Sequence, residues 1–132
     1  MQDYKNIILV IEDEKYIRIV LEYNLILEGF DVYLAEDGYT GLKLAKDLKP
    51  DLILLDWMMP EMDGLEVLSE LKHCEQTRDV PVLMLTARAS EKDIRSAQDL
   101  GIDGYIVKPF DPVLLSKDIR EKFRVKTKLM SK

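Results

Sequence analysis

Five short apolar runs recur along this chain of 132 residues, and each is followed by a segment whose apolar residues repeat at the spacing of a helix. Most of the runs are continuous rather than alternating, which is typical of strands buried on both faces of a parallel sheet. Strict alternation of strand and helix predicts βαβ units with right-handed crossovers. We therefore expect an α/β fold, a three-layer αβα sandwich with helices on both faces of a five-stranded parallel sheet. The runs cover residues 7–11, 32–35, 52–55, 82–85 and 105–107.

The segments between these runs carry the end signals of helices. Gly29 and Gly101 follow the first and fourth segments, at the position where a left-handed residue commonly ends a helix. Asp111 is a good N-cap for the fifth segment, and Pro112 suits its first helical position. The run at 32–35 is more mixed in polarity than the others, which suits a strand near the edge of the sheet.

Length and an apolar content of 47% fit one globular domain with a single core. The formal charge is −6, but residues 124–132 alone hold +4, so the preceding residues hold −10. We therefore expect a domain over residues 1–123 and a basic C-terminal tail or the start of a linker over residues 124–132. An acidic domain is not expected to bind nucleic acid, because affinity for the phosphate backbone comes mostly from Lys and Arg.

The chain has no sequence signal for a membrane or an oxidising compartment. No stretch approaches the roughly 20 apolar residues of a membrane span, and the N-terminus lacks a signal-peptide pattern. The single cysteine, Cys74, has no partner for an internal disulfide, which fits a reducing compartment. We therefore expect a cytoplasmic domain that does not contact the membrane.

Polar residues follow four of the five predicted strands. The carboxyl ends of parallel strands share one edge of a sheet, and ligands of such folds bind there. We expect these residues to converge, although each alone has an ordinary alternative. Acids also cap the next helix, a threonine fits any strand, and a lysine fits any surface. The residues are Glu12 and Asp13 after the first strand, Asp56 after the third, Thr86 after the fourth and Lys108 after the fifth.

Three converging carboxylates favour a bound cation, because without one each carboxylate raises the pKa of the others. Oxygen ligands suit Mg²⁺, whereas zinc prefers histidine and cysteine, of which the chain has only His73 and Cys74. A hydroxyl and an ammonium group beside a metal-bound carboxylate are what phosphoryl transfer to that carboxylate needs. Lys108 would offset charge on the phosphoryl oxygens, and Thr86 would donate a hydrogen bond to one of them.

Together these residues resemble the signature of response-regulator receiver domains. Each motif alone is weak, but all occur in the expected order, each at the end of the expected strand, between residue 6 and about residue 123. The resemblance implies the flavodoxin-like receiver fold with strand order 2-1-3-4-5. The motifs are Glu12-Asp13, Asp56 within residues 54–60, Met62-Asp63-Gly64, Leu85-Thr86-Ala87 and Lys108-Pro109-Phe110.

The resemblance also implies a phosphorylation reaction. Asp56 would be the phosphoacceptor, taking a phosphoryl group from a phosphohistidine on a sensor histidine kinase or a histidine phosphotransfer protein. Mg²⁺, with Mn²⁺ as a substitute, would be bound by Asp13, Asp56 and the backbone carbonyl of Met58. Glu12 would reach the metal through water.

Further roles follow from the same resemblance. Thr86 and Lys108 would hold the transferred group, and the Lys108–Pro109 peptide bond is a candidate for the cis form. On phosphorylation, Thr86 would move toward the phosphoryl group and Tyr105 would swing into the space it leaves, although a strand tyrosine is often simple packing. The fourth helix, fifth strand and fifth helix would then change as a surface.

We expect either a monomer or a phosphorylation-dependent dimer, and that changed surface is the expected site of any dimerisation. Met58 and Arg88 would flank the path of the attacking water and tune the lifetime of the phosphorylated state. In this interpretation the chain is a signalling switch that catalyses only its own phosphorylation and dephosphorylation, not a metabolic enzyme.

Three other classes fit less well. A phosphohydrolase of the haloacid-dehalogenase type needs a second aspartate two residues after the nucleophile, where this chain has Met58. A flavodoxin-like cofactor binder needs a phosphate-binding loop after the first strand, where this chain is acidic. A degenerate pseudo-receiver would lack some of the residues that are intact here. Two alternatives for output stay open: a stand-alone regulator that docks to an effector protein, and the receiver portion of a longer regulator with an output domain.

Overall fold

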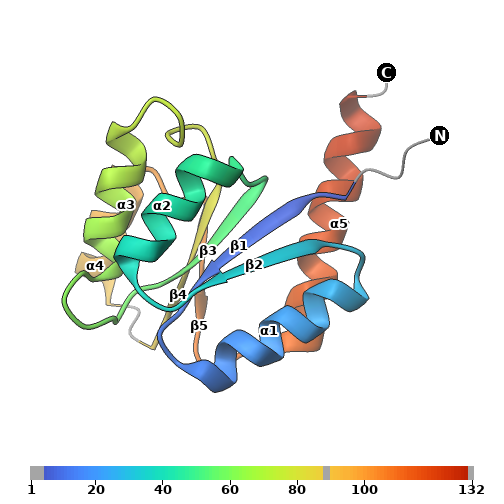
Figure 1. The fold of residues 1–132 in the computed structure, drawn as a ribbon, viewed down its shortest axis with the longest axis horizontal. Coiled ribbons are helices and arrows are strands. Elements are labelled where there is room, and N and C mark those ends of the chain that lie inside the picture. Colours follow the sequence, from blue (N-terminus) through green and yellow to red (C-terminus); the bar gives the residue numbers. More distant parts are fainter. Residues whose placement is uncertain (1–4, 88–89, 131–132) are drawn as a thin grey trace.

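A computed structural model describes residues 5–87 and 90–130, with side chains through Phe123 (Figure 1). Strands and helices alternate strictly along the chain. The five strands form one parallel sheet in the order β2-β1-β3-β4-β5, so the predicted α/β fold and strand order are confirmed. The elements are β1 (Ile7–Ile11), α1 (Lys15–Leu27), β2 (Asp31–Ala35), α2 (Gly38–Leu48), β3 (Leu52–Asp56), α3 (Gly64–His73), β4 (Val82–Thr86), α4 (Glu91–Leu100), β5 (Gly104–Val107) and α5 (Pro112–Met130).

Helices cover both faces of the sheet, with α2, α3 and α4 on one side and α1 and α5 on the other (Figure 1). Successive strand residues point to opposite faces, so each central strand supplies side chains to two apolar clusters. Leu9 and Ile11 of β1 lie in the cluster under α2, α3 and α4, whereas Ile8 and Val10 lie in the cluster under α1 and α5. This double burial explains why the central strands are continuous apolar runs.

Side-chain caps begin four of the five helices. The carboxylates of Asp37, Asp63 and Asp111 and the hydroxyl of Ser90 each accept a hydrogen bond from a backbone N–H in the first turn of the following helix. Helix α1 differs, because its N-cap residue Glu14 makes no side-chain cap hydrogen bond. The junction between β1 and α1 is therefore held by other contacts.

Several boundaries differ from the sequence prediction. Asp56 and Thr86 are the last residues of β3 and β4 rather than the first residues after them, because the ladders extend to these positions: Asp56 is paired with Leu85, and Thr86 with Val107. Helix α5 continues to Met130, into the stretch after residue 123 that the sequence predicts to be a tail or the start of a linker. Apolar spacing marks only the packed part of a helix, so it does not report an extension. The division into a domain of residues 1–123 and a basic tail or linker stays a prediction.

Within residues 5–87 and 90–130, none of the helices combines the length and the apolar character that crossing a membrane requires.

Candidate active site

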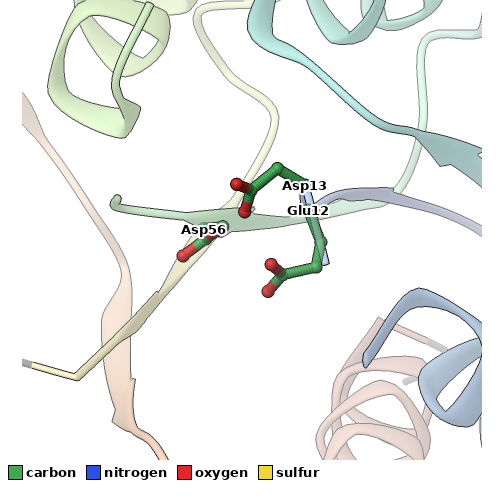
Figure 2. A group of neighbouring side chains, drawn as sticks. All are labelled: Glu12, Asp13 and Asp56. Atoms are coloured by element: carbon green, nitrogen blue, oxygen red, sulfur yellow. The ribbon is translucent and has the colours of Figure 1, made fainter. Parts of the chain in front are cut away.

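Three carboxylates meet at the carboxyl edge of the sheet. Glu12 and Asp13 directly follow β1, and Asp56 ends the neighbouring strand β3. One carboxylate oxygen of each lies within 4.8 Å of the others, and Figure 2 shows the three side chains gathered around the two strand ends. The convergence predicted from the sequence is therefore present.

Two of these acids are shielded from solvent. Glu12 is fully buried and Asp56 is 2% exposed, whereas Asp13 is partly exposed. Burial, as the largest cause, and the neighbouring Glu12 and Asp13 together raise the pKa of Asp56 to about 8, against the opposing effect of Lys108. In the absence of a cation, the Asp56 carboxyl therefore keeps its proton near neutral pH.

Lys108 supplies positive charge to this acidic cluster. Its Nζ lies 2.8 Å from Glu12 Oε1 and 3.1 Å from Asp56 Oδ1, with Glu14 at 4.0 Å. Burial alone would lower the pKa of Lys108, but its contacts with Glu12 and Asp56 outweigh burial and raise that pKa. The lysine is therefore a cation that bridges two of the three carboxylates.

Backbone contacts fix the direction of this lysine. The Lys108 N–H donates to the carbonyl of Thr86 at 2.8 Å, which continues the pairing of β4 with β5. The Lys108–Pro109 peptide bond is cis.

The cluster fits a divalent cation with oxygen ligands. Glu12 Oε1 is paired with Lys108, yet among the described residues no donor is oriented to hydrogen-bond this buried oxygen. Three clustered carboxylates with one partly exposed member suit Mg²⁺, which accepts few protein ligands and keeps several waters. The N–H of Met58 donates to Asp56 Oδ1 at 3.3 Å, and the Met58 side chain is exposed beside the site. The Met58 carbonyl as a metal ligand stays a prediction.

The predicted switch residues lie on one face of the sheet. Thr86 is buried at the end of β4, opposite Val107 in the register. Tyr105 is paired with Met84, two residues before Thr86, so Thr86 and Tyr105 project from the same side of the sheet. Tyr105 is 43% exposed. Its switch role stays a prediction, and Arg88 lies outside the described residues.

Arg18 is a residue that the sequence reasoning missed. Its guanidinium donates from Nη1 to the carbonyl oxygen of Glu12 at 2.7 Å, directly beside the acidic cluster. The available signal was its spacing: Arg18 precedes Leu21 by three residues and Leu25 by seven, so a charged residue falls on the apolar side of α1.

A family model described as the response regulator receiver domain matches residues 8–120 of this chain. The chain belongs to the response regulator receiver family. Receiver domains of two-component systems act as phosphorylated signalling switches and bind Mg²⁺ at an acidic pocket, and in this chain Glu12, Asp13 and Asp56 form an acidic cluster.

Known receivers resemble this domain in sequence and in fold. The alkaline phosphatase synthesis transcriptional regulatory protein PhoP of Bacillus subtilis (strain 168) is 48% identical over 105 residues, which cover 80% of this chain and 43% of PhoP. The CheY-like receiver domain protein of Methanospirillum hungatei JF-1 is 28% identical with a TM-score of 0.85, covering 95% of this chain and 98% of that one.

A second similar structure contains a metal. The receiver domain of sensor histidine kinase PA1611 from Pseudomonas aeruginosa PAO1 is 31% identical with a TM-score of 0.80, covering 90% of this chain and 97% of that one. It holds a magnesium ion coordinated in its active-site cleft. The present receiver domain spans less than half the length of the curated relatives it matches.

Proposed function

We propose that Asp56 is the phosphoacceptor of this receiver domain. The observation that carries the proposal is the environment of its carboxylate: nearly buried at a strand end, clustered with Glu12 and Asp13, and 3.1 Å from the ammonium group of Lys108. In the reaction an Asp56 oxygen forms a bond to phosphorus as the bond from phosphorus to the donor histidine nitrogen breaks. The donor is a phosphohistidine of a sensor histidine kinase or a histidine phosphotransfer protein.

The acidic cluster would hold Mg²⁺, or Mn²⁺ in its place, through Asp13, Asp56 and the Met58 carbonyl, with Glu12 acting through water. The magnesium ion in the PA1611 receiver supports this assignment. A bound divalent cation supplies positive charge to the phosphoryl oxygens and favours the ionised acceptor. With the cation present, Asp56 would lose the proton that its raised pKa otherwise retains.

Two further side chains would hold the transferred group. Lys108 Nζ would leave Asp56 for a phosphoryl oxygen, keeping its 2.8 Å ion pair with Glu12 as an anchor. Thr86 would donate its hydroxyl proton to a second phosphoryl oxygen. Movement of Thr86 and of Tyr105 on the same sheet face would then change the surface formed by α4, β5 and α5, through which the protein would dimerise or bind an effector.

The phosphodonor protein would dock beside Lys108. A hollow of about 550 Å³ opens there between α1 and the segment that follows β5. Its lining is mainly apolar, which suits a protein partner that brings its histidine to Asp56. The lining includes Tyr16, Ile17, Val20, Pro109 and Phe110.

The remaining assignments rest on the same proposal. We propose a cytoplasmic regulator whose receiver domain makes no direct contact with nucleic acid, either acting alone or joined to an output domain.

Incubation with acetyl phosphate and Mg²⁺, followed by intact mass measurement, tests the phosphoacceptor. We expect one added phosphoryl group in the wild-type protein, none when EDTA replaces Mg²⁺, and none in an Asp56→Asn variant. An adduct that persists in Asp56→Asn would assign phosphorylation to another residue. No adduct in folded wild-type protein would favour a pseudo-receiver that only binds partners.

A Lys108→Met variant is expected to separate metal binding from phosphoryl transfer. The Lys108 ammonium group lies about 3 Å from two of the carboxylates. Its removal should therefore strengthen Mg²⁺ binding by about tenfold, because one repelling charge is lost. Phosphorylation by acetyl phosphate should slow at least about tenfold, because the transferred group loses a cation.

Mg²⁺ binding to this variant can be followed through the fluorescence of Trp57, the only tryptophan, which follows Asp56 and is 7% exposed. A Lys117→Met variant on α5 is the control for loss of a lysine far from the cluster. Weaker Mg²⁺ binding in Lys108→Met would contradict the expectation.

A further inference from the structure

Arg18 places its guanidinium against the backbone of the acidic loop. Its side chain is only 12% exposed, and Nη1 donates to the Glu12 carbonyl oxygen at 2.7 Å. Nη2 lies 3.7 Å from Glu36 Oε2, whose side chain is 73% exposed. The well-formed contact is therefore the charge-assisted hydrogen bond to the backbone, because exposed ion pairs contribute little.

The carbonyl that Arg18 holds belongs to the peptide unit joining Glu12 to Asp13. On the other side of Glu12, its N–H donates to the Ala35 carbonyl at 3.0 Å. The backbone at Glu12 is thus fixed from both sides, by β2 and by α1. The two carboxylates leave the chain on either side of this peptide unit (Figure 2), so its orientation sets the direction of both.

No side-chain cap fixes the backbone at the start of α1. Glu14, the N-cap residue, makes no cap hydrogen bond, whereas the other four helices have an aspartate or serine cap. Glu12 instead uses its carboxylate in the cluster, where Oε1 contacts Lys108 and Oε2 accepts from the Glu14 N–H at 3.1 Å. The loop therefore depends on a side chain from the second turn of α1.

We propose that Arg18 is a positioning residue for the Mg²⁺ site: it fixes the peptide between Glu12 and Asp13 so that both carboxylates stay aimed at Asp56. This inference rests on the proposed function of the cluster. Arg18 acts through the backbone and does not touch the metal or the phosphoryl group. Loss of a contact that orients a metal ligand typically weakens metal binding by about 10- to 100-fold.

Mg²⁺ titration monitored by Trp57 fluorescence tests the proposal. We expect Arg18→Met, which keeps the aliphatic stem, to raise the Mg²⁺ dissociation constant at least about tenfold. Arg18→Lys should recover part of the affinity, since an ammonium group can donate to the same carbonyl. Glu36→Gln should stay within about twofold of wild type, because its pair is exposed and long.

Arg120→Met is the matched control. Arg120 Nη1 lies 2.9 Å from Glu28 Oε1, so this variant also breaks an arginine contact to α1, far from the acidic loop. It should leave the Mg²⁺ dissociation constant unchanged. Thermal unfolding of each variant in EDTA establishes that the Mg²⁺ titrations are made on folded protein. If Arg18→Met does not fold, the Mg²⁺ affinity of Arg18→Lys is compared with that of the wild-type protein instead.

The outcomes separate the two proposals. The positioning role alone is overturned if the Mg²⁺ dissociation constant of Arg18→Met stays within twofold of wild type. It is also overturned if Arg120→Met loses as much Mg²⁺ affinity as Arg18→Met. A wild-type protein whose fluorescence and thermal stability do not respond to Mg²⁺ overturns the proposed metal site and the inference with it.

Discussion

In metal-free buffer at pH 8, an Asp56→Asn variant is expected to be more stable than the wild-type protein by about 3 kcal/mol of unfolding free energy. Burial and the nearby Glu12 and Asp13 together raise the pKa of Asp56 from 3.8 to about 8, against the opposing effect of Lys108. The difference between these values corresponds to at most roughly 6 kcal/mol. Loss of the contact with Lys108 offsets part of the gain. Removal of the Asp56 charge should therefore reduce the repulsion among the three clustered acids.

The pH dependence of this effect has a definite sign. Between pH 3.8 and about 8, the folded protein keeps the Asp56 proton while the unfolded chain has lost it. The unfolding free energy therefore falls as pH rises through this window and levels off above it. Below pH 3.8 the group is protonated in both states and contributes no difference. The advantage of Asp56→Asn should accordingly be small near pH 4 and grow toward pH 8.

Urea unfolding in EDTA at several pH values measures this difference. Asp47→Asn, on the exposed face of α2, is the control for removing one acidic charge at the surface and should change stability little. Added Mg²⁺ should stabilise wild type more than Asp56→Asn, because ligand binding to the folded state adds to its stability. An advantage of Asp56→Asn that is equal at pH 4 and pH 8 would rule out ionisation as its cause.

The sequence predicted the fold and the composition of the cluster because both follow from periodic patterns. Continuous apolar runs predicted the buried strands, and parallel strands carry whatever follows them to the same edge. Glu12, Asp13 and Asp56 therefore converge as expected. Exact strand ends were less predictable: whether a polar residue such as Asp56 extends a ladder depends on its partner in the next strand.

Contacts that depend on side-chain reach were not predictable. The pairing of Lys108 with both Glu12 and Asp56 requires the actual separation of strand ends that are not adjacent in the sheet. Arg18 appeared in the sequence only as a charge on the apolar side of a helix. Its contact with the Glu12 carbonyl depends on how α1 leaves the sheet, which apolar spacing does not specify.

A Gly64→Ala substitution is expected to destabilise the protein by about 3 kcal/mol and to weaken Mg²⁺ binding. A Cβ at Gly64 would lie 2.6 Å from the Asp56 carbonyl oxygen and 2.7 Å from the Trp57 Cα. Both neighbours are backbone atoms, so relief requires movement of α3 or of the strand end that carries Asp56. The Gly64 N–H also donates to the Trp57 carbonyl at 2.8 Å, which makes separation of the two segments costly.

Gly29→Ala separates this effect from the general cost of replacing a glycine. Gly29 has φ +96°, and a Cβ there would meet no atom within 4 Å. Its replacement should cost about 1 kcal/mol through backbone strain, without changing the Mg²⁺ dissociation constant. Thermal or urea unfolding gives the stabilities, and Trp57 fluorescence gives the affinities. If Gly64→Ala lost stability but kept wild-type Mg²⁺ affinity, the close contact of α3 with the end of β3 would matter for folding alone. Loss of both stability and Mg²⁺ affinity would mean that this contact also fixes the position of Asp56.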